Sequence, residues 1–350
     1  MTDVLVVINA SEAQSSRRRS AQPMVSLTEK LLHHADISDV EMQNFHTLRD
    51  KFSGSDVQVN PWPFFEVDNI LPPDLYAQVL ENWPEEGSFN TLPSLVAGQS
   101  MCYLIIEDGR QPYHMDDART EFWDGFVRDW AYPLILANIE KYAWIVACRF
   151  GGEVSMLSTQ TLNLMQHRDE YTGQDSHNHY NHNVNWLFTF LLYIGDETDP
   201  GSGTGIHTFD SNDWYLNYHS ALQATVPFGS PIDNTHLVYR SEFKGNKLVS
   251  MIDSPVSLHS GTPPGTAPEG INRRIIRFHV GVPNPDIERV YGFTRQEFFA
   301  HFANKELSPG MLDSIRRDID VSRLATNREK FDEMQANASL SILDRPPPVV

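Results

Sequence analysis

The segment from Leu187 to Ile194 (LFTFLLYI) constrains the fold of this chain more than any other. Alternate residues of a β-strand point to opposite faces, and here both faces are apolar. Such a strand has to be covered on both sides, so we expect it at the centre of a sheet. Between Leu157 and Val280 the other apolar runs are short and are separated by Gly, Pro, Asn and Asp, which is typical of an all-β barrel or sandwich.

Helical patterns flank this β-rich region on both sides. Leu75 to Trp83 repeats apolar residues at helical spacing, and Trp123 to Ala147 is apolar enough for one or two buried helices. After Pro283 the pattern is helical again. The predicted fold class is therefore mainly β with flanking helices (α+β). The predicted parts are a polar, partly ordered extension (1–55), a β-rich domain with N-terminal helices (56–285) and a helical appendage with a Pro-rich tail (286–350).

Composition excludes several classes of protein. A formal net charge of −19 opposes binding to phosphate backbones, so we expect no nucleic acid partner. No run approaches the roughly 18 apolar residues of a membrane span. The charged residues of the N-terminal segment follow its apolar run, whereas in a signal peptide positive charges precede the apolar run. Cys102 and Cys148 form no C-x-x-C pair, which disfavours thiolate metal sites. A cytoplasmic protein with no membrane partner is expected, and its oligomeric state stays open.

Three histidines and an arginine have the spacing of a metal site. Residues i and i+2 of a strand share a face, so His177 and His179 present two imidazoles side by side. His259, from a distant strand, would complete a set of three ligands on one side of an ion and leave positions open for other ligands. Arg273 follows shortly afterwards.

These motifs resemble the 2-oxoglutarate/Fe(II)-dependent oxygenase superfamily, especially its prolyl-hydroxylase-like branch. That family shows a His-x-Asp pair, a T-x-x-x-Y-L strand, a distal His and an Arg that begins the last barrel strand. The matching pieces are His177-Asn178-His179, Thr189 to Ile194, His259 and Arg273 to Phe278. The resemblance covers about residues 60 to 285 and is of modest specificity, because each piece is only a few residues long.

The resemblance implies a double-stranded β-helix core of the jelly-roll or cupin-like type, with Fe(II), 2-oxoglutarate as cosubstrate and O₂. It implies that His177, His179 and His259 are the catalytic metal ligands. Arg273 would hold the far carboxylate of 2-oxoglutarate, for which its forked, permanent charge is suited. Tyr193 and Thr189 share one strand face and would assist it. The implied reaction is hydroxylation, or another oxidation, of an unactivated C–H bond in a small molecule, amino acid or peptide.

The chain departs from the family at the carboxylate ligand. Where the family has Asp, this chain has His179, or Asn181 if the pair is His179-Tyr180-Asn181. An Asn or an empty position would resemble the halogenating members, in which a halide takes the vacated place. A rival motif is His167-Arg168-Asp169, which matches His-x-Asp literally but lies far upstream of Tyr193.

Other interpretations of the same residues belong to different classes. A three-His cupin-type dioxygenase would bind iron without a 2-oxo acid, and Arg273 argues against it because such an enzyme has no need of it. A non-catalytic binding protein with a degenerate metal site would explain the missing carboxylate. The HNHYNH cluster could also be a polar surface loop, with Arg273, Arg274 and Arg277 on a solvated strand. The ordered spacing favours the oxygenase.

Overall fold

The structure is a computed structural model. It describes residues 37–89, 99–106, 109–110, 115–150, 157–167, 176–177, 179, 185–195, 198–199, 201–211, 213, 234–261, 273–294, 296–297, 300 and 308–338. The strands are β1 (Phe64–Val67), β2 (Gln99–Ile106), β3 (Gly109–Arg110), β4 (Ser158–His167), β5 (Trp186–Ile194), β6 (Thr198–Asp199), β7 (Gly205–Phe209), β8 (Thr235–Arg240), β9 (Phe243–Lys244), β10 (Leu248–Ile252), β11 (Leu258–Ser260) and β12 (Arg273–Gly281). The helices are α2 (Asp39–Ser53), α3 (Pro73–Glu81), η2 (Glu86–Ser88), α4 (Asp117–Phe126), η3 (Val127–Ala131), α5 (Tyr132–Lys141), α6 (Ala143–Phe150), η5 (Asn284–Asp286), α8 (Ile287–Tyr291), α10 (Pro309–Ala325) and α11 (Arg328–Asn337).

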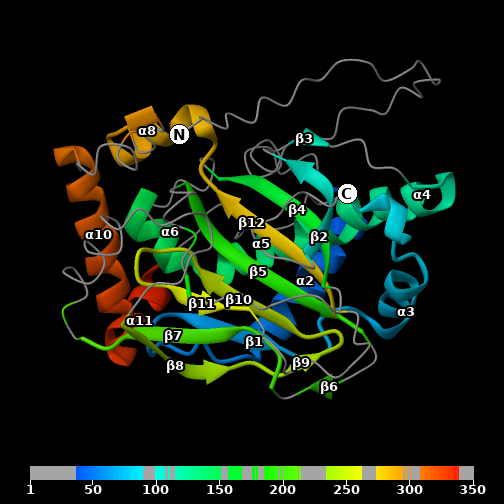
Figure 1. Cartoon of the computed structure of the whole chain (residues 1–350), viewed down its shortest axis with the longest axis horizontal. Helices are drawn as coiled ribbons and strands as arrows, with labels where there is room; N and C mark the ends of the chain where they lie inside the picture. The colour runs from blue at the N-terminus through cyan, green and yellow to red at the C-terminus, as the bar shows by residue number, and fades with distance from the viewer. Residues whose placement is uncertain are drawn as a thin grey trace, which may run out of the picture.

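The strands form antiparallel sheets (Figure 1). The large sheet has seven strands in the order β1-β10-β5-β12-β4-β2-β3, and a smaller one has the order β11-β7-β8. The β6–β9 pair forms a third sheet. His177 extends the smaller sheet, because it forms an antiparallel bridge with His259 of β11. From β4 onward the chain therefore passes back and forth between the two larger sheets. It adds one or two strands to one sheet before it crosses to the other.

The predicted central strand is confirmed. β5 lies between β10 and β12 in the large sheet. Its side chains from Leu187 to Ile194 are buried on both faces. The mixed class of antiparallel sheets with flanking helices is confirmed as well.

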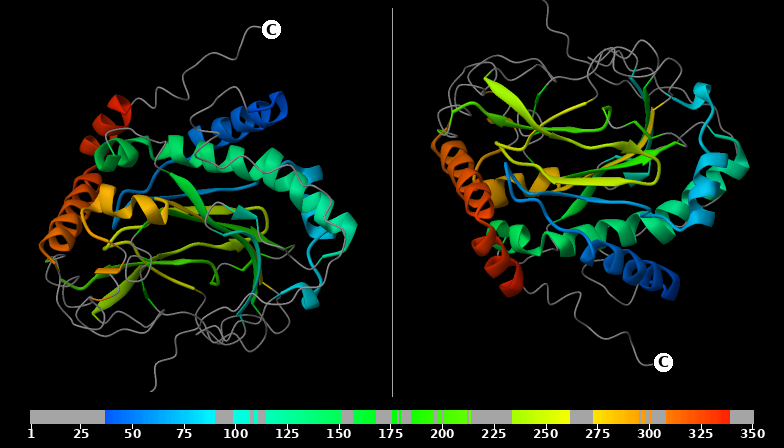
Figure 2. Two further views of the ribbon diagram at one scale, coloured as in Figure 1. Left: turned by 90° about the horizontal axis from the view of Figure 1, so that it is seen from above. Right: turned by 90° about the horizontal axis from the view of Figure 1, so that it is seen from below.

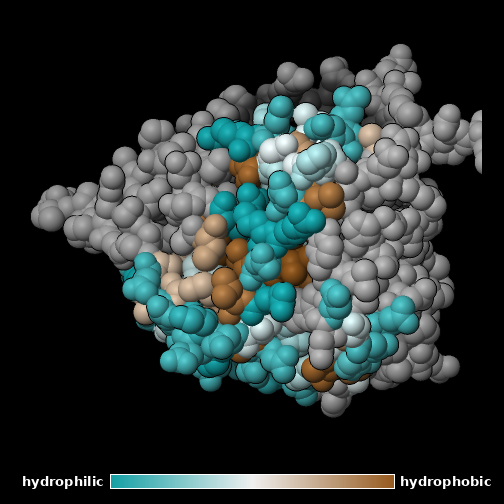
Figure 3. Space-filling model, turned by 90° about the vertical axis from the view of Figure 1, so that its left-hand side faces the viewer, coloured by the Kyte–Doolittle hydropathy of each residue, from teal (hydrophilic) through white to brown (hydrophobic). Residues whose placement is uncertain are grey.

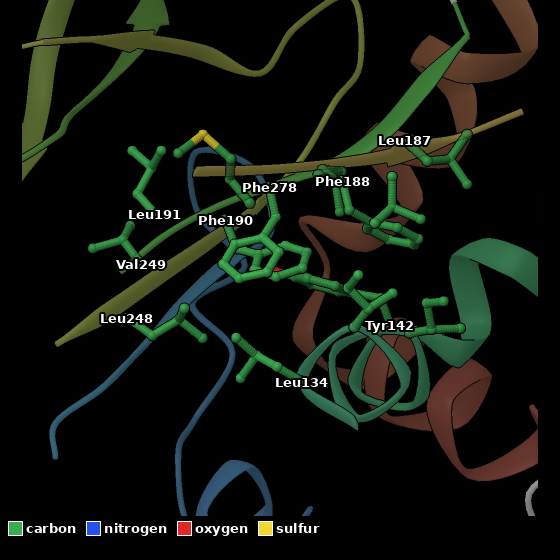
Figure 4. Packing of buried hydrophobic residues seen from close by; sticks show 14 of the residues in the cluster. Leu134, Tyr142, Leu187, Phe188, Phe190, Leu191, Leu248, Val249 and Phe278 are labelled. Carbon is green, nitrogen blue, oxygen red and sulfur yellow. The ribbon is translucent and has the colours of Figure 1, made fainter. Parts of the chain in front are cut away.

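One face of the large sheet packs on helices (Figure 2). Phe190 stacks on Phe278 of the neighbouring strand with ring centroids 4.5 Å apart, and Tyr142, at the end of α5, stacks on Phe188 at 5.4 Å. Figure 4 shows these rings with Leu134 of α5 between the strands and the helices. The opposite face of the sheet is directed toward the smaller sheet, and it carries polar residues such as Thr189, Arg273 and His279.

The segment expected to be a polar extension contains α2. Its mean hydropathy is low, but Phe45, Leu48 and Phe52 recur on one side and are buried in the core against α5. The sequence pattern did not reveal this helix because its apolar stripe is narrow among charged residues. The boundary near residue 55 stays a prediction, and the helix expected around 25–34 lies outside the described residues.

The C-terminal helices α10 and α11 pack on α6. Ile315 and Ile319 of α10 are buried, and Phe331 of α11 meets Trp144 edge-on at 5.4 Å. Arg149 of α6 forms a buried ion pair with Asp318 of α10 at 3.5 Å. Figure 3 shows that hydrophilic side chains cover much of the described part of this face. Among the helices that the structure describes, none combines the length and the apolar character needed to cross a membrane.

Candidate metal centre

Strand pairing brings the three predicted histidines together. His177 and His259 exchange backbone hydrogen bonds of 2.9 and 2.8 Å, so their rings lie side by side with centroids 4.3 Å apart. His179 comes from the same segment as His177, and its ring centroid is 4.5 Å from that of His259. All three are buried, and one nitrogen of each lies within 4.8 Å of the others.

The spacing of the nitrogens fits a metal ion. The Nε2 atoms of His179 and His259 are 3.2 Å apart. Two imidazole nitrogens that bind one ion at about 2.1 Å, roughly at right angles, lie about 3.0 Å apart. Burial lowers the pKa of both His179 and His259 well below the usual value, with the neighbouring His177 adding to the effect. Neutral imidazoles with facing lone pairs are the form in which histidine binds metals.

Asp253 lies directly behind one of these histidines. It follows β10, and its Oδ1 atom is 2.8 Å from Nδ1 of His179. Its other oxygen, Oδ2, accepts a hydrogen bond of 2.6 Å from the Thr189 hydroxyl. A carboxylate in this position holds the proton on Nδ1, so that Nε2 points its lone pair at the ion. Burial raises the pKa of Asp253 to about 7.

Asp253 is a residue of this centre that the sequence motifs did not predict. The family's ligand carboxylate was expected next to His177, within the same short motif. The structure instead places a carboxylate behind His179, from a residue 74 positions further along the chain. A carboxylate bound to a ligand histidine makes that imidazole more basic and more anionic. Part of the missing negative charge is thus supplied through His179.

Replacing Asp253 with Asn should weaken metal binding by about 10- to 100-fold, the usual cost of losing such a partner. The neutral amide keeps the size of the side chain but loses its charge. Competition of Fe(II) or Ni(II) with a chromogenic chelator measures the affinity. Asp210→Asn is the matched control, because Asp210 bonds Nδ1 of the exposed His236 at 2.7 Å. Equal metal affinity in the Asp253 variant and wild type would contradict this role.

A second group of potential ligands consists of His179, Asp253 and His279. Its centre is taken by the Thr189 hydroxyl, which lies 2.8 Å from Nδ1 of His279 and 3.0 Å from Nδ1 of His179. His279 also stacks on Trp186 with ring centroids 3.7 Å apart. A hydroxyl that bonds all three side chains leaves no place for an ion, so we interpret this group as the wall that supports the first one.

The residues predicted to hold the cosubstrate lie on the same face of the sheet. Arg273 opens β12, is 2% exposed, and its Cζ lies 5.6 Å from the centre of the Phe243 ring. Tyr193 stacks on the same ring at 4.7 Å. The structure therefore brings Arg273 and Tyr193 together around Phe243. Thr189 does not join them, because its hydroxyl bonds His179, Asp253 and His279. Its role with the cosubstrate stays a prediction.

The histidine of the rival motif lies elsewhere on the sheet. His167 ends β4 directly opposite Arg273, and it belongs to none of the groups of possible ligands among the described residues. Burial, reinforced by Arg273 and Arg277, lowers its pKa to about 3. Asp169 and Asn181 lie outside the part of the chain that the structure describes, so their positions stay untested.

No family model matches this chain, and no curated protein matches it. Several solved structures are similar to it. A prolyl hydroxylase from Trichoplax adhaerens, in complex with a hypoxia inducible factor oxygen degradation domain peptide fragment, has a TM-score of 0.42 and 12% identity over 71% of this chain and 95% of its own. A prolyl 4-hydroxylase structure from Phytophthora capsici has a TM-score of 0.39 and 15% identity over 86% and 93%.

A prolyl-4-hydroxylase from Pseudomonas putida has a TM-score of 0.36 and 12% identity over 66% of this chain and 97% of its own. All three structures are named as prolyl hydroxylases, and the sequence motifs resemble that class.

Proposed function

We propose that this protein is an Fe(II)- and 2-oxoglutarate-dependent oxygenase that oxidises an unactivated C–H bond. The observation that carries the proposal is the joint placement of two elements on one face of the large sheet. His177, His179 and His259 converge with facing nitrogens, and Arg273 lies buried at the start of β12 beside Tyr193. A metal site paired with a fixed guanidinium suits a cosubstrate that chelates iron at one end and is anionic at the other.

The strand order supports a double-stranded β-helix. Within the large sheet β4, β12, β5 and β10 are neighbours, while His177, β11, β7 and β8 are neighbours in the other sheet. In a jelly roll, two four-stranded sheets lie face to face and the chain contributes strands to them in turn. The strand order here agrees with that arrangement. It places the segment with His177 and the strand with His259 side by side, which the metal site requires.

Each residue has a defined task in this proposal. Bound iron would supply the activation of O₂. His177, His179 and His259 would hold the ion from one side and leave its other side open. Asp253 would fix the orientation of His179. Arg273 would bind the far carboxylate of 2-oxoglutarate, and the apolar faces of Phe243 and Tyr193 would shield that ion pair from water.

The geometry favours hydroxylation over halogenation. Nε2 of His179 lies 3.2 Å from Nε2 of His259, which supports His179 as the ligand in the place of the family's carboxylate. A halide would need that place to be vacant. The substrate is a small molecule, an amino acid or a peptide.

The purified protein should release succinate from 2-oxoglutarate in the presence of Fe(II) and O₂, and chloride should not change the rate. The measurement compares succinate formation with and without chloride in wild type and in His179→Asp. Strong stimulation of wild type by chloride would support a halogenase. Iron binding without any effect of 2-oxoglutarate would favour the three-His dioxygenase, and a protein that turns over in no condition would be a binding protein.

A further inference from the structure

Besides the metal centre, a row of polar residues lies on the face of the large sheet that is directed toward the smaller sheet. We call this the inner face. Arg277 of β12 pairs directly with Asn163 of β4, and Asn163 pairs with Tyr103 of β2. Directly opposed residues of antiparallel strands share a face. Arg277 is two residues before His279, which touches Thr189 and His179, so this row points to the same side as the metal centre.

Asn163 is fully buried, yet its side chain makes no hydrogen bond to the part of the chain that the structure describes. Neither Nδ2 nor Oδ1 has a partner among the described residues. A buried polar group left without a partner costs about 1–3 kcal/mol. An amide held at this cost on the inner face of the sheet suggests that a ligand completes its hydrogen bonds, because its NH₂ group offers two donors and its carbonyl oxygen is an acceptor.

The two arginines on this face of β12 serve different regions. Arg273 lies over Phe243, on the side of the sheet where Tyr193 of β5 is found. Arg277 extends the other way across β4, since its Nη2 atom is 3.2 Å from Sδ of Met101 on β2. Along β12, Arg277 therefore lies between His279, whose ring is 5.0 Å from that of His179, and Arg273, and its guanidinium extends away from β5 across β4.

We propose that Arg277 and Asn163 bind the carboxylate of the primary substrate, and that this substrate is an amino acid unit with a free carboxylate. The guanidinium and the Asn163 amide N–H would bind the carboxylate oxygens. Oδ1 of Asn163 would accept the N–H group on the adjacent carbon. This inference depends on the proposed function, because it assigns the substrate of that same site.

The charge of Arg277 favours an anionic group over a cationic one. Its guanidinium is permanently positive, so a lysine-like cation beside it would be repelled. This local charge matters because the net charge of −19 would by itself favour cationic substrates.

The test uses N-acetylglycine and its amide, which differ only in the free carboxylate. Each is titrated under argon into the full-length protein loaded with Fe(II) and 2-oxoglutarate, and binding is followed through the metal-to-ligand absorption band. N-acetylglycine should change the band saturably, and the amide should not. In Arg277→Leu and Asn163→Leu this binding should weaken on the order of 10- to 100-fold, the loss expected for hydrogen bonds to a charged group.

The affinity for 2-oxoglutarate provides the control within the same experiment. Both variants should bind 2-oxoglutarate as wild type does, which also shows that they fold. Equal responses to the two compounds, no response to either, or undiminished binding of N-acetylglycine in the Arg277 variant would overturn the subsite. If the band never forms in wild type, the proposed function itself fails, and the substrate assignment falls with it. The two failures are thus distinguishable.

Discussion

Replacing His259 with alanine is expected to abolish stoichiometric iron binding. His259 supplies one of three nitrogens, and its Nε2 atom lies 3.2 Å from that of His179, so its loss removes one side of the site. His177→Ala and His179→Ala should have the same effect. Elemental analysis after anaerobic reconstitution measures one iron per wild-type chain and far less than one in each variant.

Two histidine variants serve as controls for this result. His236→Ala removes an exposed histidine that bonds Asp210, and it should retain iron. His167→Ala should also retain iron, because His167 lies opposite Arg273 and outside the group of three. Full iron content in His259→Ala would refute the assignment. Loss of iron in His167→Ala and Asp169→Ala, with retention in His177→Ala, would establish the rival motif instead.

Replacing Arg273 with alanine should weaken 2-oxoglutarate binding by roughly two to three orders of magnitude. Removing one partner of a buried charged pair costs about 3–5 kcal/mol, and about 1.4 kcal/mol corresponds to a factor of ten. Arg273 is 2% exposed, so its loss would leave the carboxylate in a buried place without a charged partner. Titration of the Fe(II) protein with 2-oxoglutarate under argon, followed by absorption, gives the dissociation constant.

The neighbouring residue provides a matched control for this variant. Arg274 is on the opposite face of β12, where its guanidinium lies 5.7 Å from the Trp83 ring centre. Arg274→Ala should leave 2-oxoglutarate binding unchanged. Unchanged binding in Arg273→Ala together with a large loss in Arg277→Ala would show that Arg277 is the anchor, and the proposed substrate subsite would then be wrong as well.

Features that depend on local periodicity were predictable from the sequence. The apolar run Leu187–Ile194 predicted the central strand because a strand exposes two faces and both were apolar. The i, i+2 spacing of His177 and His179 predicted that their side chains would lie side by side, and their ring centroids are 5.6 Å apart. The helices near Leu75 and between Trp123 and Ala147 followed from apolar residues at helical spacing.

The same reasoning failed where few apolar residues carry the packing. In α2 the buried positions are separated by charged residues, so composition suggested a polar extension. Its packing against α5 decides its structure, and local pattern does not report such contacts.

Only the tertiary structure decided which distant side chains meet. Asp253 lies behind His179 because β10 ends beside β5, and nothing in the residues around Asp253 marks it as a partner of a histidine 74 positions earlier. The register of β12 against β4 likewise places Arg277 beside Asn163. Strand order and register depend on the packing of whole layers, and a shift of one residue would turn each of these side chains to the other face. The sequence by itself determined which residues could bind a metal, while the fold determined which residues support them.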